Sequence, residues 1–539
     1  MAYLVPDLRP RDDAGLPETP LVPREPWPRP SSSKQPRRRL PGANLCQAGE
    51  APSDLTPLRR HSLPTTLPPT SLRPLIKESA IYGLGLALAR GFSVLLTLVL
   101  ARVFSPADFG LLELLQTAAG LCSMFLSCYM ESALLRYYEQ ELDKRRLVST
   151  YLWTQAALAI LFLSISLLLG PPLTRRFLGF EDHKLLLAVA CAAAATPFYT
   201  HALTLLRAQR AAGFAARLIV AHAAISSLLP AALLLARGPD LATVFFSRAT
   251  ADSFCALATV LTRRSLYGRC YSQHTLLQYL KFGGPLLPEG AIAFLGAHAS
   301  QLYVLSYASV AEVGLLALAN RLASGVRLVL ASLRQAWQPF AFSVKDHAAI
   351  DALVVSTFKA YAQITLLLLA ASTLAAREII LIFAGPPYSA AVPLLGPVIA
   401  GSVLSGLPYL FATGLLLENK TYYYTLGTLL SSLASVATGW WTIRHWGIIA
   451  APFAAIAGAL VFSTVVFLAS RRVRGASYGP RPFSLFILVV VAIATLAPLG
   501  VANLPLPVRS ALLFLSACVL LSSSPLARKL WPKATGFNQ

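Results

Sequence analysis

The stretch IYGLGLALARGFSVLLTLVLARVFSPADFGLLELLQTAAG, residues 81–120, decides the fold class of this chain. It contains two apolar runs, and a helix of about 20 apolar residues spans the roughly 30 Å hydrocarbon core of a bilayer. Between the runs, Pro106 cannot continue a helix, whereas Ser105 and Asp108 can cap the next one. Gly110 permits close packing where the chain re-enters the membrane. The stretch therefore predicts two membrane-spanning helices joined by a tight turn.

Apolar runs of the same kind recur through the rest of the chain. Of the 539 residues, 55% are hydrophobic and 13% are charged, and the mean hydropathy is +0.60. Soluble domains contain nearer to about 25% charged residues. We therefore predict an all-α integral membrane protein with about 14 transmembrane helices. The spans are expected near 78–102, 109–135, 150–169, 185–206, 214–236, 242–262, 284–307, 312–335, 353–374, 390–416, 421–442, 447–469, 483–502 and 506–523.

The charge pattern and the cysteines argue against other classes of protein. The formal net charge is +22, but the Lys and Arg residues lie in short segments between apolar runs, so we expect no nucleic-acid partner. The seven cysteines are scattered, without a C-x-x-C pair or metal-ligand spacing. His201, His222 and His298 are isolated within apolar runs. The sequence therefore predicts neither a metal site nor a cofactor.

Residues 1–75 differ in composition from the rest of the chain. They are rich in proline and carry basic groups such as Arg37-Arg38-Arg39, and they show no helical or strand period. They also lack the continuous apolar core of a secretion signal. We expect a disordered cytoplasmic tail. Two interpretations stay open, an inert tail or an arm that binds a partner or anionic lipids.

Alternate loops carry most of the Lys and Arg residues, as the cytoplasmic loops of membrane proteins do. Examples are Lys144-Arg145-Arg146, the segment 263–281 and the segment 471–481. We therefore expect a multi-pass membrane protein with both termini in the cytoplasm. After the 1–75 tail, the expected organisation is a first bundle at 76–262, an amphipathic connector at 263–283, a second bundle at 284–470, two C-terminal helices at 471–525 and a cytoplasmic tail at 526–539.

Several short sequences resemble one family of transporters. They are ARVFSPADFG at 101–110, SALLRYY at 132–138, IILIFAGPPYSAAVPLL at 379–395 and GIIAAPFAAIAG at 447–458. In this order they resemble the polysaccharide-transporter, or O-antigen flippase, family of the multidrug/oligosaccharidyl-lipid/polysaccharide exporter superfamily. The resemblance extends over about 76–525. Many relatives carry an Asp-Arg pair in the seventh span, where this chain has Gln301-Leu302, so no role of that pair can be transferred.

The resemblance implies two six-helix bundles around a central cationic cavity, with the last two helices peripheral. It also implies alternating access, which moves an undecaprenyl-diphosphate-linked oligosaccharide from the cytoplasmic to the periplasmic face. Such a protein is a flippase and not an enzyme. Its expected partners are the lipid-linked oligosaccharide, membrane lipids and, in the same pathway, a polysaccharide polymerase and glycosyltransferases.

Ionisable residues inside the predicted spans are the candidate site residues, because each costs about 3 kcal/mol at a helix centre without a partner or water. Arg90, Arg321 and Arg327 are the candidates for substrate binding, since a guanidinium can donate two parallel hydrogen bonds to a phosphate. Arg90 could instead belong to a structural ion pair, and Arg327 could extend to the membrane surface. Glu289, beside prolines expected to break the seventh span, and Asp252 are candidates for ion coupling. A capping or packing role for either acid stays open.

The sequence leaves other functions open. A lipid II flippase or a drug/cation antiporter belongs to the same superfamily, but arginines in the cavity would repel cations. A membrane enzyme such as a polysaccharide polymerase would need a polar catalytic loop, and the expected outer loops are short. The residues favour the flippase.

Overall fold

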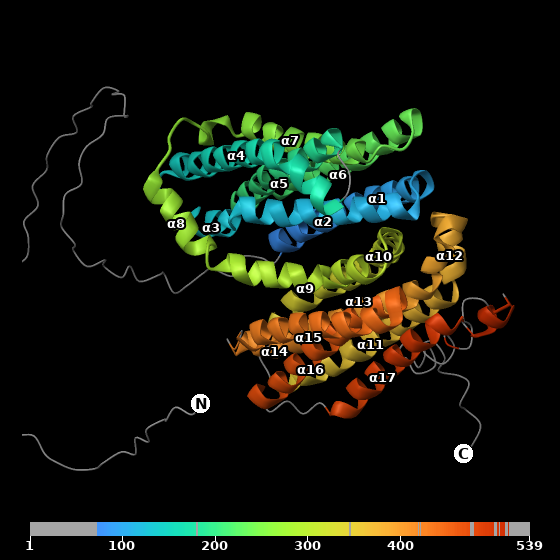
Figure 1. The fold of residues 1–539 in the computed structure, drawn as a ribbon. Helices are drawn as coiled ribbons and strands as arrows, with labels where there is room; N and C mark the ends of the chain where they lie inside the picture. Colours follow the sequence, from blue (N-terminus) through green and yellow to red (C-terminus); the bar gives the residue numbers. More distant parts are fainter. Residues whose placement is uncertain are drawn as a thin grey trace, which may run out of the picture. The chain divides into compact units, whose positions relative to one another are not determined.

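The computed structural model describes residues 73–178, 182–343, 347–418, 420, 422–474, 479–500, 504–505, 507–512 and 516 (Figure 1). These residues form helices and connecting loops, with no strand among them. Nearly all of the predicted 1–75 tail, the 526–539 tail and most of the predicted last span lie outside the described residues. The expectation of an all-α protein is confirmed.

The helices follow the order of the predicted spans. The first group and the connector comprise α1 (Arg73–Val103), α2 (Pro106–Ser127), α3 (Met130–Tyr137), α4 (Lys144–Leu178), α5 (His183–Ala208), α6 (Ala212–Arg237), α7 (Leu241–Thr262), η1 (Arg264–Leu266) and α8 (Gln273–Gly283). The second group comprises α9 (Leu286–Tyr307), α10 (Val310–Ser343), α11 (His347–Leu374), α12 (Ala376–Phe383), η2 (Pro386–Ala391), α13 (Val392–Gly406), α14 (Pro408–Leu417), α15 (Tyr422–Trp446), η3 (Gly447–Ala450), α16 (Ala451–Arg474), α17 (Pro480–Leu496) and η4 (Ala497–Leu499).

In the described part of the chain, 11 helical stretches are long and apolar enough to cross a membrane. One of them, Tyr422–Val473, contains both α15 and α16, and α9 is not among the 11. The protein is therefore a multi-pass membrane protein, while the number of 14 spans stays a prediction.

Two predicted spans are interrupted. The span expected at 109–135 ends at Ser127, because Cys128 and Tyr129 have left-handed φ angles of 47° and 52° before α3 begins. α8 packs against α3 and against the turn before it, where a Cβ on Gly283 would collide with the carbonyl oxygen of Cys128. The span expected at 390–416 is divided at Leu407, since Pro408 lacks the N–H that would continue the helix.

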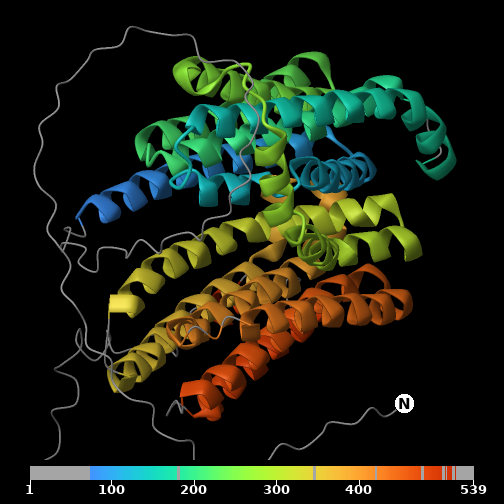
Figure 2. The ribbon, with the colours of Figure 1, turned by 90° about the vertical axis from the view of Figure 1, so that its left-hand side faces the viewer.

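The helices form two bundles with the same order of packing. In the first bundle α1 packs on α6, α2 and α4 on α5, and α7 on α5 and α6. In the second bundle α9 packs on α15, α10 and α11 on α13, and α16 on α13 and α15. The views in Figures 1 and 2 show the bundles as two layers with α8 running between them at one edge. The packing order of the first bundle is thus repeated in the second.

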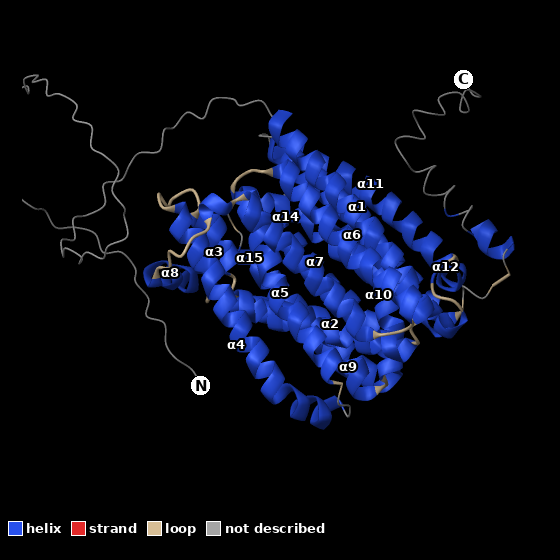
Figure 3. Cartoon of the chain, turned by 90° about the horizontal axis from the view of Figure 1, so that it is seen from above, coloured by secondary structure: helices blue, strands red, loops and turns tan. Residues whose placement is uncertain are grey.

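The bundles meet where α2 packs against α10, with smaller contacts of α1 with α10 and α2 with α9. Figure 3 shows these helices from above. The N-termini of α2 and α10 carry the related sequences SPADFG, 105–110, and SVAEVG, 309–314. In each, the serine caps the helix by accepting from the backbone N–H of the acid three positions on. A Cβ on Gly110 would collide with the carbonyl oxygen of Val310. The two helices therefore touch backbone to backbone at this end.

Candidate functional site

An ion pair joins the two bundles at the centre of their contact. Arg321 of α10 donates from Nη2 to Oε2 of Glu113 on α2 at 3.0 Å, and from Nε to the same oxygen at 3.3 Å. Its Nη2 also donates to Oε1 of Gln116 at 2.8 Å, and its guanidinium lies 5.0 Å from the ring centroid of Phe109. The Arg321 and Glu113 side chains are only 20% and 17% exposed. The charge of Arg321 is thus largely balanced by Glu113.

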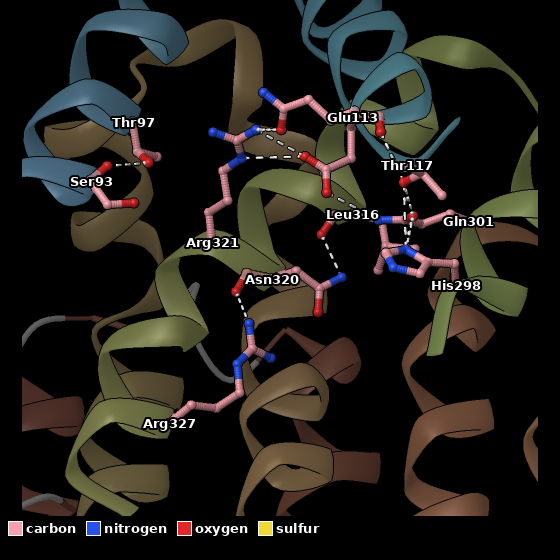
Figure 4. Close-up of polar contacts among 11 residues, drawn as sticks. Ser93, Thr97, Glu113, Thr117, His298, Gln301, Leu316, Asn320, Arg321 and Arg327 are labelled. Atoms are coloured by element: carbon pink, nitrogen blue, oxygen red, sulfur yellow. Dashed lines mark hydrogen bonds and ion pairs between the residues drawn. The ribbon is translucent and has the colours of Figure 1, made fainter. Parts of the chain in front are cut away.

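Polar groups of α9 extend this ion pair into a network, shown in Figure 4. Gln301 Nε2 donates to Oε1 of Glu113 at 3.3 Å, and Gln301 Oε1 lies 3.0 Å from Nδ1 of His298. The hydroxyl of Thr117 on α2 lies 3.2 Å from the same Gln301 oxygen. The network connects α2 of the first bundle with α9 and α10 of the second. Gln301, to which the sequence assigned no role, is part of it.

One pocket lies on the first-bundle side of this network and has a volume of about 360 Å³. We call it the arginine pocket. Its polar lining residues are Arg90, Ser93, Gln116, Tyr199, His222, Ser226, Ser227, Arg248 and Arg321. Arg90 forms no ion pair with any residue in the described ranges, so its guanidinium is available to a ligand. The structure brings the predicted residues Arg90 and Arg321 together here.

Asp252 lies behind the wall of the arginine pocket and is 1% exposed. Its Oδ1 is 2.7 Å from His222 Nε2, and its Oδ2 accepts from the Thr196 hydroxyl at 2.8 Å. Arg248 Nε is 4.0 Å from the same Oδ2. His222 stacks on Tyr199 with a centroid distance of 4.0 Å. The acid therefore contacts the pocket through His222 and Arg248.

Glu289 lies in the first turn of α9, near the start of the predicted seventh span. The expected break of the helix lies at Pro285, between α8 and α9, whereas α9 runs through Pro288 and Glu289 without a break. Pro288 falls in the first turn, where backbone N–H groups have no partner within the helix and a proline is tolerated. Glu289 is exposed in that turn and lines neither the arginine pocket nor the cavity described next.

A second cavity of about 580 Å³ lies on the other side of the network, mainly within the second bundle. We call it the serine cavity. Its polar lining residues are Glu113, His298, Ser300, Gln301, Asn320, Arg327, Ser402, Ser405, Thr428, Ser431, Ser432 and Ser435. Arg327 donates from Nη1 to the Ser402 hydroxyl at 3.3 Å and from Nη2 to the Asn320 carbonyl at 2.5 Å. Arg327 thus lines this cavity, whereas Arg90 and Arg321 line its neighbour.

The sequence contained signals for some of the residues that the prediction missed. Arg248 is an ionisable residue inside the predicted span 242–262, like Arg90 in its own span. Thr428, Ser431, Ser432 and Ser435 follow the spacing of one helix face. The pairing of Glu113 with Arg321 had no such signal, because the two lie 208 positions apart and meet only through the packing of α2 on α10.

Two repeated helical bundles in a membrane, with polar pockets at their contact, define a transporter of the flippase and exporter type. The chain belongs to the family described as "Polysaccharide biosynthesis protein", whose sequence profile matches residues 75–345, half of the chain. The resemblance inferred from the sequence is thereby confirmed. A comparison with curated protein sequences gave no match.

Solved structures of transporters share the fold. The lipid II flippase MurJ in an inward closed conformation has a TM-score of 0.59 and 13% identity, over 78% of this chain and 98% of that one. An inward-facing multidrug resistance MATE family transporter has a TM-score of 0.55 and 14% identity, over 74% and 98%. The Vibrio cholerae MATE transporter VcmN has a TM-score of 0.52 and 13% identity, over 77% and 98%. At these identities the likeness establishes the fold of a flippase or transporter.

Proposed function

We propose that the protein is a flippase of the bacterial inner membrane that carries an undecaprenyl-diphosphate-linked oligosaccharide from the cytoplasmic to the periplasmic face. The product would enter synthesis of O-antigen, capsule or exopolysaccharide. A polysaccharide polymerase and glycosyltransferases of the same pathway are the proposed partners. The observation that carries the proposal is the arginine pocket, which combines an unpaired Arg90 with Arg248 and Arg321 at the contact of the two bundles.

The chemistry of this pocket fits a diphosphate. Arg90 has no acidic partner in the described part of the chain, and a guanidinium offers two parallel donors to phosphate oxygens. An unpaired charge within a span costs about 3 kcal/mol, which a bound anion or water would offset. An organic cation would instead meet the positive charge of Arg90, which no acid in the described residues balances. The pocket therefore favours an anionic headgroup over the substrates of drug/cation antiporters.

The contact of the bundles fits alternating access. With both termini in the cytoplasm, as the loop charges predict, the N-termini of α2 and α10 lie on the periplasmic side. Their backbone contact at Gly110 and Gly314 then closes that side. Parting these helices would open the pockets to the periplasm, and the repeated packing of the two bundles suits a rocking motion.

Asp252 is the proposed group for ion coupling. It faces Thr196 of α5, His222 of α6 and Arg248 of α7, and His222 also stacks on Tyr199. A proton that the Asp252–His222 pair takes up from water, or releases to it, would change the charge beside the arginine pocket. Glu289 lies outside both pockets, so we assign the coupling to Asp252.

Deleting the gene in its host and restoring variants tests the function. We expect the deletion to remove surface polymer and to accumulate the lipid-linked oligosaccharide on the cytoplasmic side. Wild type and Arg217→Ala, which changes an exposed arginine of α6, should restore the polymer, whereas Arg90→Ala should not. Arg90→Lys, which keeps the charge without the two-donor fork, should restore it in part.

Two results would contradict the proposal. The first is that the deletion leaves surface polymer and lipid-linked intermediates unchanged in a host without a second flippase. The second is that the chain restores growth to a host that lacks its lipid II flippase, while deletion of the chain leaves surface polymer unaffected. This result would favour the lipid II alternative.

A further inference from the structure

We propose that the serine cavity binds the saccharide part of the lipid-linked substrate, so that selectivity for the glycan resides mainly in the second bundle. This inference rests on the proposed function, in which the diphosphate occupies the arginine pocket. It adds a second subsite with a different chemistry. The arginine pocket would read the diphosphate common to all such lipids, and the serine cavity would read the sugar.

The lining of the serine cavity combines hydroxyl and carboxamide groups with small apolar residues. Its hydroxyl and carboxamide groups come from α9, α10, α13 and α15. The acid in its wall, Glu113, is balanced by Arg321 at 3.0 Å, which leaves Arg327 as a cation without an acidic partner in the described ranges. Pro452 and Phe462 of α16 supply an apolar wall. A sugar presents the same combination, hydroxyl groups around an apolar ring face.

Several of these groups already donate a hydrogen bond to a backbone carbonyl and keep their acceptors free. The hydroxyl of Ser405 donates to the Ser402 carbonyl at 2.7 Å, and that of Thr428 donates to the Tyr424 carbonyl at 3.1 Å. Asn320 Nδ2 donates to the Leu316 carbonyl at 3.1 Å. Because each hydroxyl has one proton, its lone pairs remain, as does Oδ1 of Asn320. Sugar hydroxyls both donate and accept, so they can pair with these acceptors and with the remaining N–H donors of Asn320 and Arg327.

The position of the cavity also fits a lipid-linked sugar. Glu113 lines the serine cavity and Arg321 lines the arginine pocket, so their ion pair forms the partition between the two. A diphosphate held by Arg90 would therefore place the attached sugar beside the serine cavity. The cavity volume of about 580 Å³ lies within the range of roughly 300–1,000 Å³ found for small-ligand sites. It could hold a few sugar rings rather than a polymer.

Binding of two lipids to the purified full-length protein in nanodiscs tests the division. The probes are undecaprenyl diphosphate and the undecaprenyl-diphosphate-linked oligosaccharide extracted from membranes of the deletion strain. We expect wild type to bind the oligosaccharide lipid more tightly. Asn320→Ala combined with Ser405→Ala should lower the affinity for the oligosaccharide lipid about tenfold. Its affinity for undecaprenyl diphosphate should stay within twofold of the wild-type value. Arg90→Ala should lower the affinity for both lipids.

Two further variants control for folding. Ser306→Ala removes an exposed hydroxyl of α9 that donates to the Leu302 carbonyl outside the cavity, and it should bind both lipids as wild type does. Thr428→Val keeps the shape of the side chain and removes only the cavity hydroxyl. Thr428→Val should lower the affinity for the oligosaccharide lipid alone. This variant tests the subsite even if the Asn320→Ala, Ser405→Ala double variant does not fold.

The outcomes separate the two proposals. If cavity variants that fold bind the oligosaccharide lipid as wild type does, or weaken both lipids equally, the saccharide subsite is overturned while the proposed function stands. If wild type binds neither lipid, the proposed function fails and the subsite fails with it.

Discussion

The arginine pocket and the serine cavity occupy bundles with the same packing order, yet their linings differ in chemistry. In the first bundle, α1 and α6 contribute Arg90 and His222. The helices in the corresponding places of the second bundle, α9 and α15, contribute Gln301 and a face of hydroxyl groups. Helix packing depends on small residues and shape, so it tolerates different polar groups toward the pocket. A repeated scaffold can thus provide an arginine-lined site in one bundle and a site lined mainly by hydroxyl groups in the other.

The contact that both pockets share should be the most sensitive to change. Gly314→Ala places a methyl group against the Pro106 carbonyl oxygen, a backbone atom that cannot rotate away. We expect loss of surface polymer and a large drop in the amount of folded protein, measured by detergent-extracted yield and polymer staining. Gly325→Ala, in the same helix but with open space around it, is the matched control and should behave as wild type. Equal behaviour of the two variants would show that the contact is not required.

The partition between the pockets comes next in expected effect. Glu113→Gln leaves the mostly buried Arg321 without its charge partner, which costs about 3 kcal/mol for such pairs. Thermal unfolding in detergent should show this loss, and Arg321→Gln in the same chain should restore part of the stability. The ion pair would not support the partition if the single and double variants melted at the wild-type temperature.

Asp252 should affect transport more than folding. Asp252→Asn removes the charge of a carboxylate held 2.7 Å from His222 but keeps a group that can form hydrogen bonds, so we expect transport to fall while the protein still folds. We also expect transport to lose its dependence on pH. Flux of lipid-linked oligosaccharide in vesicles at several pH values measures both effects. A pH profile identical to that of wild type would remove Asp252 from the coupling.

The smallest effect is expected outside both pockets. Arg509 donates to both carboxylate oxygens of Glu378, at 2.7 and 2.6 Å, and these hydrogen bonds lower the pKa of Glu378. Because the folded-state pKa is depressed, the pair stabilises the protein above the ordinary pKa of a glutamate, and this contribution is lost as the pH falls through the folded-state value. Glu378→Gln should therefore lower the melting temperature slightly at pH 7 and have no effect in strong acid. A difference that persisted in acid would contradict this account.

The sequence predicted the helices better than their interruptions. Apolar runs between charged loops locate helices because a bilayer requires both features. Pro408 was a visible reason for dividing the span at 390–416. Nothing local explains the left-handed Cys128 and Tyr129, since their conformation is fitted to α8, which follows more than 100 positions later. Interruptions set by tertiary contacts are not visible in a local pattern.

The candidate site was predicted in part for the same reason. Arg90 and Arg321 could be predicted because a charged residue inside a span is unfavourable unless it meets a partner or water. Arg321 and Arg327 both lie on α10, and their division between the two pockets depends on what packs against each face of that helix, which the sequence does not show. The serine cavity was missed because a hydroxyl group in a transmembrane helix can donate to a backbone carbonyl of the same helix. Serine and threonine therefore occur in such helices without marking a site.

Flipping by the purified protein in liposomes tests the central claim most directly. The probe is the undecaprenyl-diphosphate-linked oligosaccharide extracted from the deletion strain, and the readout is its accessibility to a glycosidase added outside. We predict that wild type and Arg217→Ala exchange the lipid between leaflets far faster than empty liposomes, and that Arg90→Ala does not. Exchange at the empty-liposome rate with wild type, or at the wild-type rate with Arg90→Ala, would contradict the account.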